Sequence, residues 1–166
     1  MSKLLSFPNP VNEKAARVVA AVVMAIALLT LATGWHWLLI PLAYGFIARV
    51  LTGPTLSPLG RLASRVIAPR LGPPKDVSGP PKRFAQGMGA VITTTAAVLS
   101  LGFGLHTAGT VLLAALVVAA GLESIFAYCL GCQIFGLLMR AGVIPERICA
   151  ECGDIWSRPR MARSGA

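Results

Sequence analysis

Long apolar runs without charge, separated by basic or turn-forming stretches, dominate the pattern of this chain. Residues 18–48 contain no Asp, Glu, Lys or Arg, and neither do residues 84–122. A helix crosses a bilayer with ~20 apolar residues, so the second run has room for most of two crossings joined by a turn. The pattern therefore predicts an all-α integral membrane protein, with residues 1–166 forming a single membrane domain.

Four transmembrane helices are expected, at about 15–34, 36–53, 84–105 and 109–131. The first apolar run is short for two full crossings of ~20 residues each. Its second helix therefore either crosses at a tilt or forms part of a shallow re-entrant hairpin, with the turn at Gly34. Apolar sequence continues past the last predicted crossing to Met139, which is too long for a straight span, so we expect a break near Gly131.

All Lys and Arg residues lie outside the apolar cores or at their ends. By the positive-inside rule, both termini, the connector 54–83 and the cysteine-containing tail 140–166 are predicted to be cytoplasmic, with the protein in a plasma (inner) membrane. Within the connector, apolar residues recur at helical spacing from Leu59 to Ile67, which predicts a short helix lying on the lipid surface. Before the first crossing, Asn12 is expected to cap the helix.

Composition supports the membrane interpretation, and the placement of the basic residues weakens the alternative of nucleic-acid binding. The hydrophobic fraction is 55% and charged residues make up 13%, whereas about a quarter of the residues in a soluble domain are charged. The net charge of +9 could indicate nucleic-acid binding. We expect no nucleic-acid partner, because no aromatic-rich basic motif accompanies the charge and the basic residues stand where membrane topology requires them.

The four cysteines form two pairs of C-x-x-C spacing, Cys129 with Cys132 and Cys149 with Cys152. Such a pair can close a small disulfide ring or bind a metal, and on a helix both thiols share a face. Four thiolates in two such pairs also suit zinc or an iron–sulfur cluster. Paired cysteines in the cytosol are more often catalytic or metal-binding than structural, although buried cysteines can also be ordinary apolar packing.

Glu123 is the only acid in the last two predicted crossings, which makes it a candidate proton acceptor for a thiol. On a straight helix Glu123 and Cys132 would face opposite ways, ~13 Å apart along the axis. Glu123 could instead stay protonated or pair with Arg49. His36 and His106 lie in the two predicted outer turns, where they could approach each other and bind a metal or move a proton, although lone interfacial histidines are commoner.

Several short motifs spread along the chain carry a family resemblance. They are Asn9-Pro10-Val11-Asn12-Glu13, Gly53-Pro54, Ser57-Pro58-Leu59, Pro74-Lys75, Pro81-Lys82-Arg83-Phe84-Ala85 and Tyr128-Cys129-Leu130-Gly131-Cys132. Through them the chain resembles, over roughly residues 7–156, the bacterial membrane family catalogued as domain of unknown function 4395. The resemblance implies an integral membrane protein with a paired-cysteine site, and companions among thioredoxin-like and sulfur-transfer enzymes.

Three functional hypotheses follow. The first is a membrane-embedded, thiol-active protein for thiol–disulfide redox or sulfur handling, whose site residues are Cys129, Cys132, Cys149, Cys152 and Glu123. Its expected partners are membrane lipid and a soluble thioredoxin-like or sulfur-transfer protein. The second is a non-enzymatic membrane adaptor, with the four cysteines holding a structural zinc or an iron–sulfur cluster. The third is a small transporter of a sulfur species, which would require a homo-oligomer because four short helices leave little room for a pathway.

Overall fold

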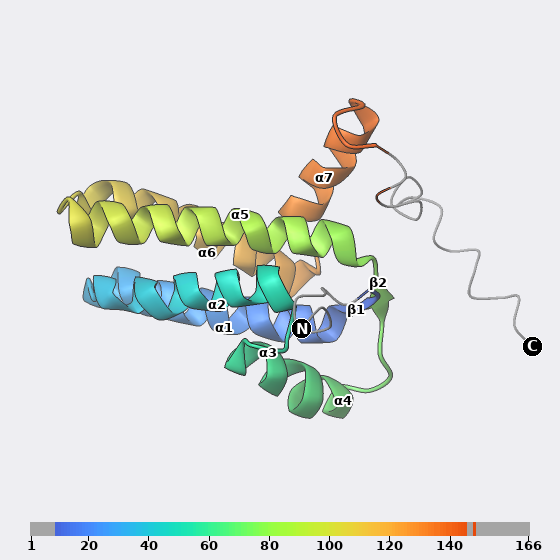
Figure 1. The fold of residues 1–166 in the computed structure, drawn as a ribbon. Helices are drawn as coiled ribbons and strands as arrows, with labels where there is room; N and C mark the ends of the chain where they lie inside the picture. Colours follow the sequence, from blue (N-terminus) through green and yellow to red (C-terminus); the bar gives the residue numbers. More distant parts are fainter. Residues whose placement is uncertain (1–8, 146–147, 149–166) are drawn as a thin grey trace, which may run out of the picture.

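The computed structural model describes residues 9–145 and 148, and Figure 1 shows an elongated bundle of helices. Its long helices are α1 (Glu13–Thr33), α2 (Leu39–Thr52), α5 (Gly79–Ala97) and α6 (His106–Phe126). Helix α1 packs mainly along α6 and α2 along α5, while α5 also contacts α6. The predicted all-α class is confirmed for the described residues, which add only a short antiparallel pair of strands, β1 (Val11–Asn12) and β2 (Asp76–Val77).

Within the part of the chain that the structure describes, three helices are long and apolar enough to cross a membrane. They are Glu13–Thr33, Gly79–Gly102, in which α5 continues through a π-helical turn at Val98–Gly102, and His106–Phe126. The predicted number of four crossings is not confirmed, because the apolar segment His36–Thr52 is shorter than these spans. That segment consists of a turn of 3-10 helix (His36–Leu38) followed by α2.

Local signals set both ends of α1. Asn12 is the N-cap, and its side-chain oxygen accepts a hydrogen bond from the backbone N–H of Lys14 at 3.0 Å. This confirms the predicted cap, which satisfies one of the helix's free N–H groups. Gly34 ends the helix with a φ of 71°, a left-handed conformation that glycine adopts without strain. The predicted turn at Gly34 is therefore also confirmed.

A helical arm occupies the connector after α2 and lies beside α1 (Figure 1). It is built from α3 (Pro58–Leu62), a π-helical turn (Ala63–Ile67) and α4 (Ala68–Arg70). Leu59 packs against the hydrophobic core of the bundle, whereas Leu62 and Val66 remain exposed. The short helix predicted in the connector is therefore present, and its contact with lipid stays a prediction.

Two glycines let helices approach closely at the end of the bundle where α7 (Leu130–Arg140) begins. A Cβ atom on Gly89 of α5 would overlap the Phe46 ring of α2. A Cβ atom on Gly131 of α7 would lie 2.6 Å from the Cα of Ala85 in α5. Because neither glycine carries a side chain, α2 and α7 can both pack closely against α5.

Candidate thiol site at the break between two helices

The break between α6 and α7 places the first cysteine pair. Ala127 ends α6 with a φ of 56°, in the left-handed region that alanine rarely adopts, and its N–H bonds the carbonyl of Leu122. Cys129 then occupies the N-cap position of α7. The break thus falls just before the position near Gly131 that the sequence predicts. The free N–H groups and positive dipole end of α7 therefore lie beside Cys129.

Cys129 and Cys132 are free thiols that lie outside the three long apolar helices. The Cys129 residue is only 7% exposed, and Cys132 is half-buried. The Cys132 thiol donates a hydrogen bond to the Cys129 sulfur, which lowers the pKa of Cys129 below its ordinary value even though burial opposes the change. Donating this hydrogen bond, together with burial, raises the pKa of Cys132. Cys129 is therefore the better thiolate of the pair, and Cys132 is its protonated partner.

A buried ion pair influences both thiols. The Nζ atom of Lys82 and the Oε1 atom of Glu123 are 2.5 Å apart, with 8% and 15% of the two side chains exposed. The ammonium of Lys82 interacts electrostatically with Cys129 and Cys132 and favours negative charge on Cys129. Glu123 therefore pairs with Lys82, and the pairing with Arg49 considered from the sequence is wrong. The break after α6 also removes the straight-helix geometry that would hold Glu123 away from the thiols.

Arg49 is a second buried cation, on α2, with 6% of the residue exposed. Its Nε donates a hydrogen bond to the Oε1 atom of Gln86 at 2.8 Å, and the guanidinium lies 4.6 Å from the centre of the Phe46 ring. Glu123 attracts Arg49 electrostatically without forming an ion pair with it. Among the described residues, the buried Nη2 atom of Arg49 has no hydrogen-bond partner.

Cys129 borders two cavities. The first has a volume of about 270 Å³, lies among α1, α2, α5, α6 and the start of α7, and is also bordered by Arg49, Gln86 and Glu123. The second has a volume of about 230 Å³ and is bordered by Lys82, Cys129 and Cys132. The Cys129 residue thus lies between a mostly apolar cavity and a second cavity that also adjoins Cys132.

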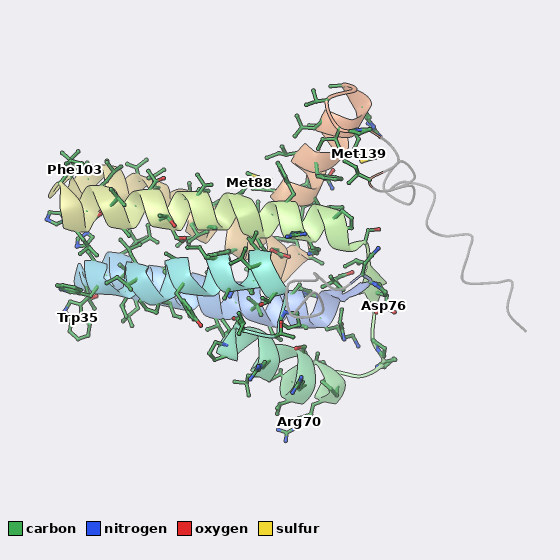
Figure 2. All side chains as sticks on the ribbon, viewed as in Figure 1. Trp35, Arg70, Asp76, Met88, Phe103 and Met139 are labelled. Atoms are coloured by element: carbon green, nitrogen blue, oxygen red, sulfur yellow. The ribbon has the colours of Figure 1, made fainter. Side chains whose placement is uncertain are left out.

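The predicted zinc or iron–sulfur site requires Cys149 and Cys152, which lie outside the described residues, so that hypothesis stays a prediction. Within residues 9–145 and 148, no three His, Cys, Asp or Glu side chains form a group that could hold a metal ion. His36 and His106 do approach each other, with ring centroids 4.5 Å apart. Trp35 and Phe103, their near neighbours in sequence, lie at the end of the bundle remote from α7 (Figure 2).

Lys82 is the site residue that sequence reasoning missed, because the pattern places it in the connector 54–83, outside the apolar runs. One sequence signal indicates that Lys82 lies inside a helix. Pro80 and Pro81 suit the first turn of a helix, so the helix begins before Lys82 and not at Phe84 as expected. A lysine inside the first turn of an apolar helix then needs a partner, and Glu123 is the only acid in the two adjoining apolar runs.

Residues 11–140 match the protein family described as domain of unknown function (DUF4395). This range covers most of the chain and includes Lys82, Glu123, Cys129 and Cys132, whereas Cys149 follows it. No curated protein and no solved structure gives a significant match.

Proposed function

We propose that this chain, which belongs to the family of unknown function DUF4395, is a membrane-embedded thiol protein that performs thiol–disulfide exchange or sulfur transfer through Cys129 and Cys132. One observation carries the proposal, the placement of Cys129 at the start of α7 with a hydrogen bond from Cys132 and the nearby charge of Lys82. The thiolate is the nucleophile in such chemistry, and a helix N-terminus and an adjacent cation both stabilise it.

The exchange takes place in two balanced steps. The thiolate of Cys129 attacks one sulfur of a partner disulfide, which forms a mixed disulfide and releases the partner's other sulfur as a thiolate. Cys132 then gives its proton to that departing thiolate and attacks the Cys129 sulfur, which closes the Cys129–Cys132 disulfide. The second partner sulfur, released as a thiolate, takes up a proton from water, so the partner gains two electrons and leaves as a dithiol, while this chain loses two. Glu123 acts in this scheme as a positioning residue that holds Lys82 near the thiols.

The proposed partner is a soluble thioredoxin-like or sulfur-transfer protein on the cytoplasmic side of the plasma membrane. The turns around His36 and His106 contain no Lys or Arg, whereas the connector is basic. In Figure 2, Trp35 and Phe103 lie at one end of the bundle, and Arg70 lies toward the other. By the positive-inside rule this orientation has both termini and the thiol pair inside the cell, with α2 as a fourth, tilted crossing.

Exchange with a thioredoxin disulfide tests the proposal. Full-length protein in lipid nanodiscs is reduced, freed of reductant and mixed with oxidised thioredoxin, and the appearance of thioredoxin dithiol is followed by alkylation and mass spectrometry. We expect exchange to be lost in Cys129→Ser and to stop after one step in Cys132→Ser. Tyr128→Phe, which changes a neighbouring residue and leaves both thiols, is the control. Unchanged exchange in Cys129→Ser would refute the proposal.

A further inference from the structure

The mostly apolar cavity beside Cys129 is not needed for exchange with a soluble partner. Its volume is about 270 Å³, roughly nine times the volume of ~30 Å³ that a water molecule takes up in the liquid. Most of its wall consists of apolar side chains from α1, α5 and α6. The other cavity borders both Cys129 and Cys132 and already gives a protein partner access to the pair. The apolar cavity therefore has room for a second reactant next to the same sulfur.

The apolar cavity opens on the side of the helical bundle. Ala115 and Ile134 border it, and both residues are exposed. Ala115 lies near the middle of α6, one of the helices long enough to cross a membrane. Ile134 belongs to α7, which points away from the long helices (Figure 1). The middle of a crossing helix lies in the hydrocarbon layer, so this opening faces lipid and a ligand enters it from the bilayer.

The charges around the apolar cavity balance, which favours a neutral ligand. Among the described residues, Arg49 is the cation on its border and Glu123 the carboxylate. Lys82, the ion-pair partner of Glu123, borders the other cavity instead. Lys82 also favours negative charge on Cys129, which offsets this second cation. A charged ligand would leave an uncompensated charge in an apolar space, which is strongly unfavourable.

Arg49 lacks an acceptor for one of its donors. The residue is 6% exposed, and its Nε donates to Gln86. Its buried Nη2 atom has no hydrogen-bond partner among the described residues. A buried donor without a partner costs free energy, which an uncharged oxygen in the cavity removes without changing the charge balance. The ligand that fits is therefore a neutral, lipid-soluble molecule with a carbonyl oxygen.

We propose that this cavity binds a membrane quinone, with a carbonyl oxygen that accepts a hydrogen bond from Arg49 and a ring that lies beside Cys129. A quinone ring is flat, neutral and mostly apolar, which suits the wall, and it accepts two electrons, which suits a bordering dithiol. A lipid acyl chain also suits the wall, but it offers Arg49 no acceptor and the thiols no oxidant. The redox part of this inference rests on the proposed thiol function of Cys129.

The reaction with the quinone is balanced. The thiolate of Cys129 adds to a ring carbon, and Cys132 then attacks the Cys129 sulfur. The S–S bond forms and the S–C bond breaks, with its electron pair left on the ring. The quinone takes up one proton from Cys132 and one from water and leaves as a quinol, with the two electrons that the chain lost. A reduced protein partner reopens the disulfide by the reverse of thiol–disulfide exchange, so electrons pass from a soluble dithiol to the quinone.

Photolabelling with an azidoquinone tests the binding site. Full-length protein in phosphatidylcholine nanodiscs is labelled with and without excess decylubiquinone, and the labelled peptides are mapped. We expect saturable labelling of the peptides that border the cavity. Arg49→Gln should weaken binding by about ten- to a hundred-fold, the range for a charged hydrogen bond. Because lipid is in large excess, an acyl chain that filled the cavity would prevent saturable labelling. That result, or equal affinity in Arg49→Gln, would overturn the proposal.

A pair of phenylalanine variants on α6 tests the opening without changing any charge. Ala115→Phe fills the opening, whereas Ala114→Phe changes an exposed neighbour that does not border the cavity. Both positions are exposed, so the two variants should unfold at the same midpoint as wild type in a thermal scan. We expect Ala115→Phe to lose labelling and Ala114→Phe to keep it. Equal labelling of the two variants would show that the quinone does not enter this cavity.

Quinone reduction tests the electron transfer. Reduced protein, freed of reductant and oxygen, is mixed with decylubiquinone, and quinol and the Cys129–Cys132 disulfide are both quantified. We expect equal amounts of the two products in wild type and neither in Cys129→Ser, which should still be photolabelled. Labelling of wild type without quinol would overturn the electron transfer. Thioredoxin exchange without saturable labelling would refute the quinone site alone, whereas quinone reduction without thioredoxin exchange would refute the protein partner alone.

Discussion

The buried ion pair between Lys82 and Glu123 should contribute strongly to the stability of the protein, so that losing either partner lowers the free energy of unfolding. With 2.5 Å between Nζ and Oε1 and side-chain exposures of 8% and 15%, water cannot replace either lost partner fully. Removing one member of a buried pair costs ~3–5 kcal/mol, because an uncompensated charge remains. We expect Glu123→Gln and Lys82→Met each to lower the free energy of unfolding by about 3 kcal/mol, the lower end of that range, because Glu123 keeps some access to solvent.

The matched control is the double variant that carries both Lys82→Met and Glu123→Gln. Replacing a buried pair by neutral groups is often neutral or stabilising, so the free energy of unfolding should return to within ~1 kcal/mol of wild type. Reversible unfolding of the four proteins in mixed detergent micelles gives the coupling free energy of this double-mutant cycle. Additive losses in the double variant would show that the two side chains do not depend on each other, and the reasoning would fail.

The remaining predictions concern thiol reactivity and packing. Because the pKa of Cys129 is lowered, its thiolate should persist below the pH at which an ordinary thiol is protonated. The rate of Cys129 alkylation should fall only as the pH drops through that lowered pKa, whereas Cys132, with a raised pKa, should react only in more alkaline solution. Peptide mapping over a pH series measures the alkylation of each cysteine. The same pH dependence for Cys129 and Cys132 would contradict the assignment. Gly89→Ala should destabilise the protein by ~1–3 kcal/mol through its clash with Phe46. Gly87→Ala, on the same helix in open space, should stabilise by up to ~1 kcal/mol, and thermal unfolding that ranked the two alanine variants equally would contradict the packing.

Much of the fold is predictable because membrane helices satisfy their own backbone groups and therefore depend on local sequence. Long apolar runs predict the helical class, Asn12 predicts the cap of α1, and Gly34 predicts its end. Each signal acts within a few residues. Whether α2 crosses the membrane is harder to predict. Residues 18–48 supply two helices, and the length of this apolar run does not decide whether the second helix crosses fully.

The site is less predictable, because it depends on contacts between distant parts of the chain. Lys82 and Glu123 are 41 positions apart, and no local pattern links them. The break occurs at Ala127, a residue type without a turn preference. Gly131, where the break was expected, lies inside α7 and permits close packing on Ala85. A glycine that serves packing and one that serves a turn look alike in sequence, which explains the shift of the predicted break.

The central claim is that Cys129 is the attacking sulfur and Cys132 the resolving one. The most direct measurement is trapping of the mixed disulfide between the Cys132→Ser variant and oxidised thioredoxin, followed by peptide mapping of the cross-link. The proposed order of attack requires the cross-link at Cys129, with no comparable species in Cys129→Ser. A cross-link carried by Cys132 in Cys129→Ser and formed at the same rate would contradict it.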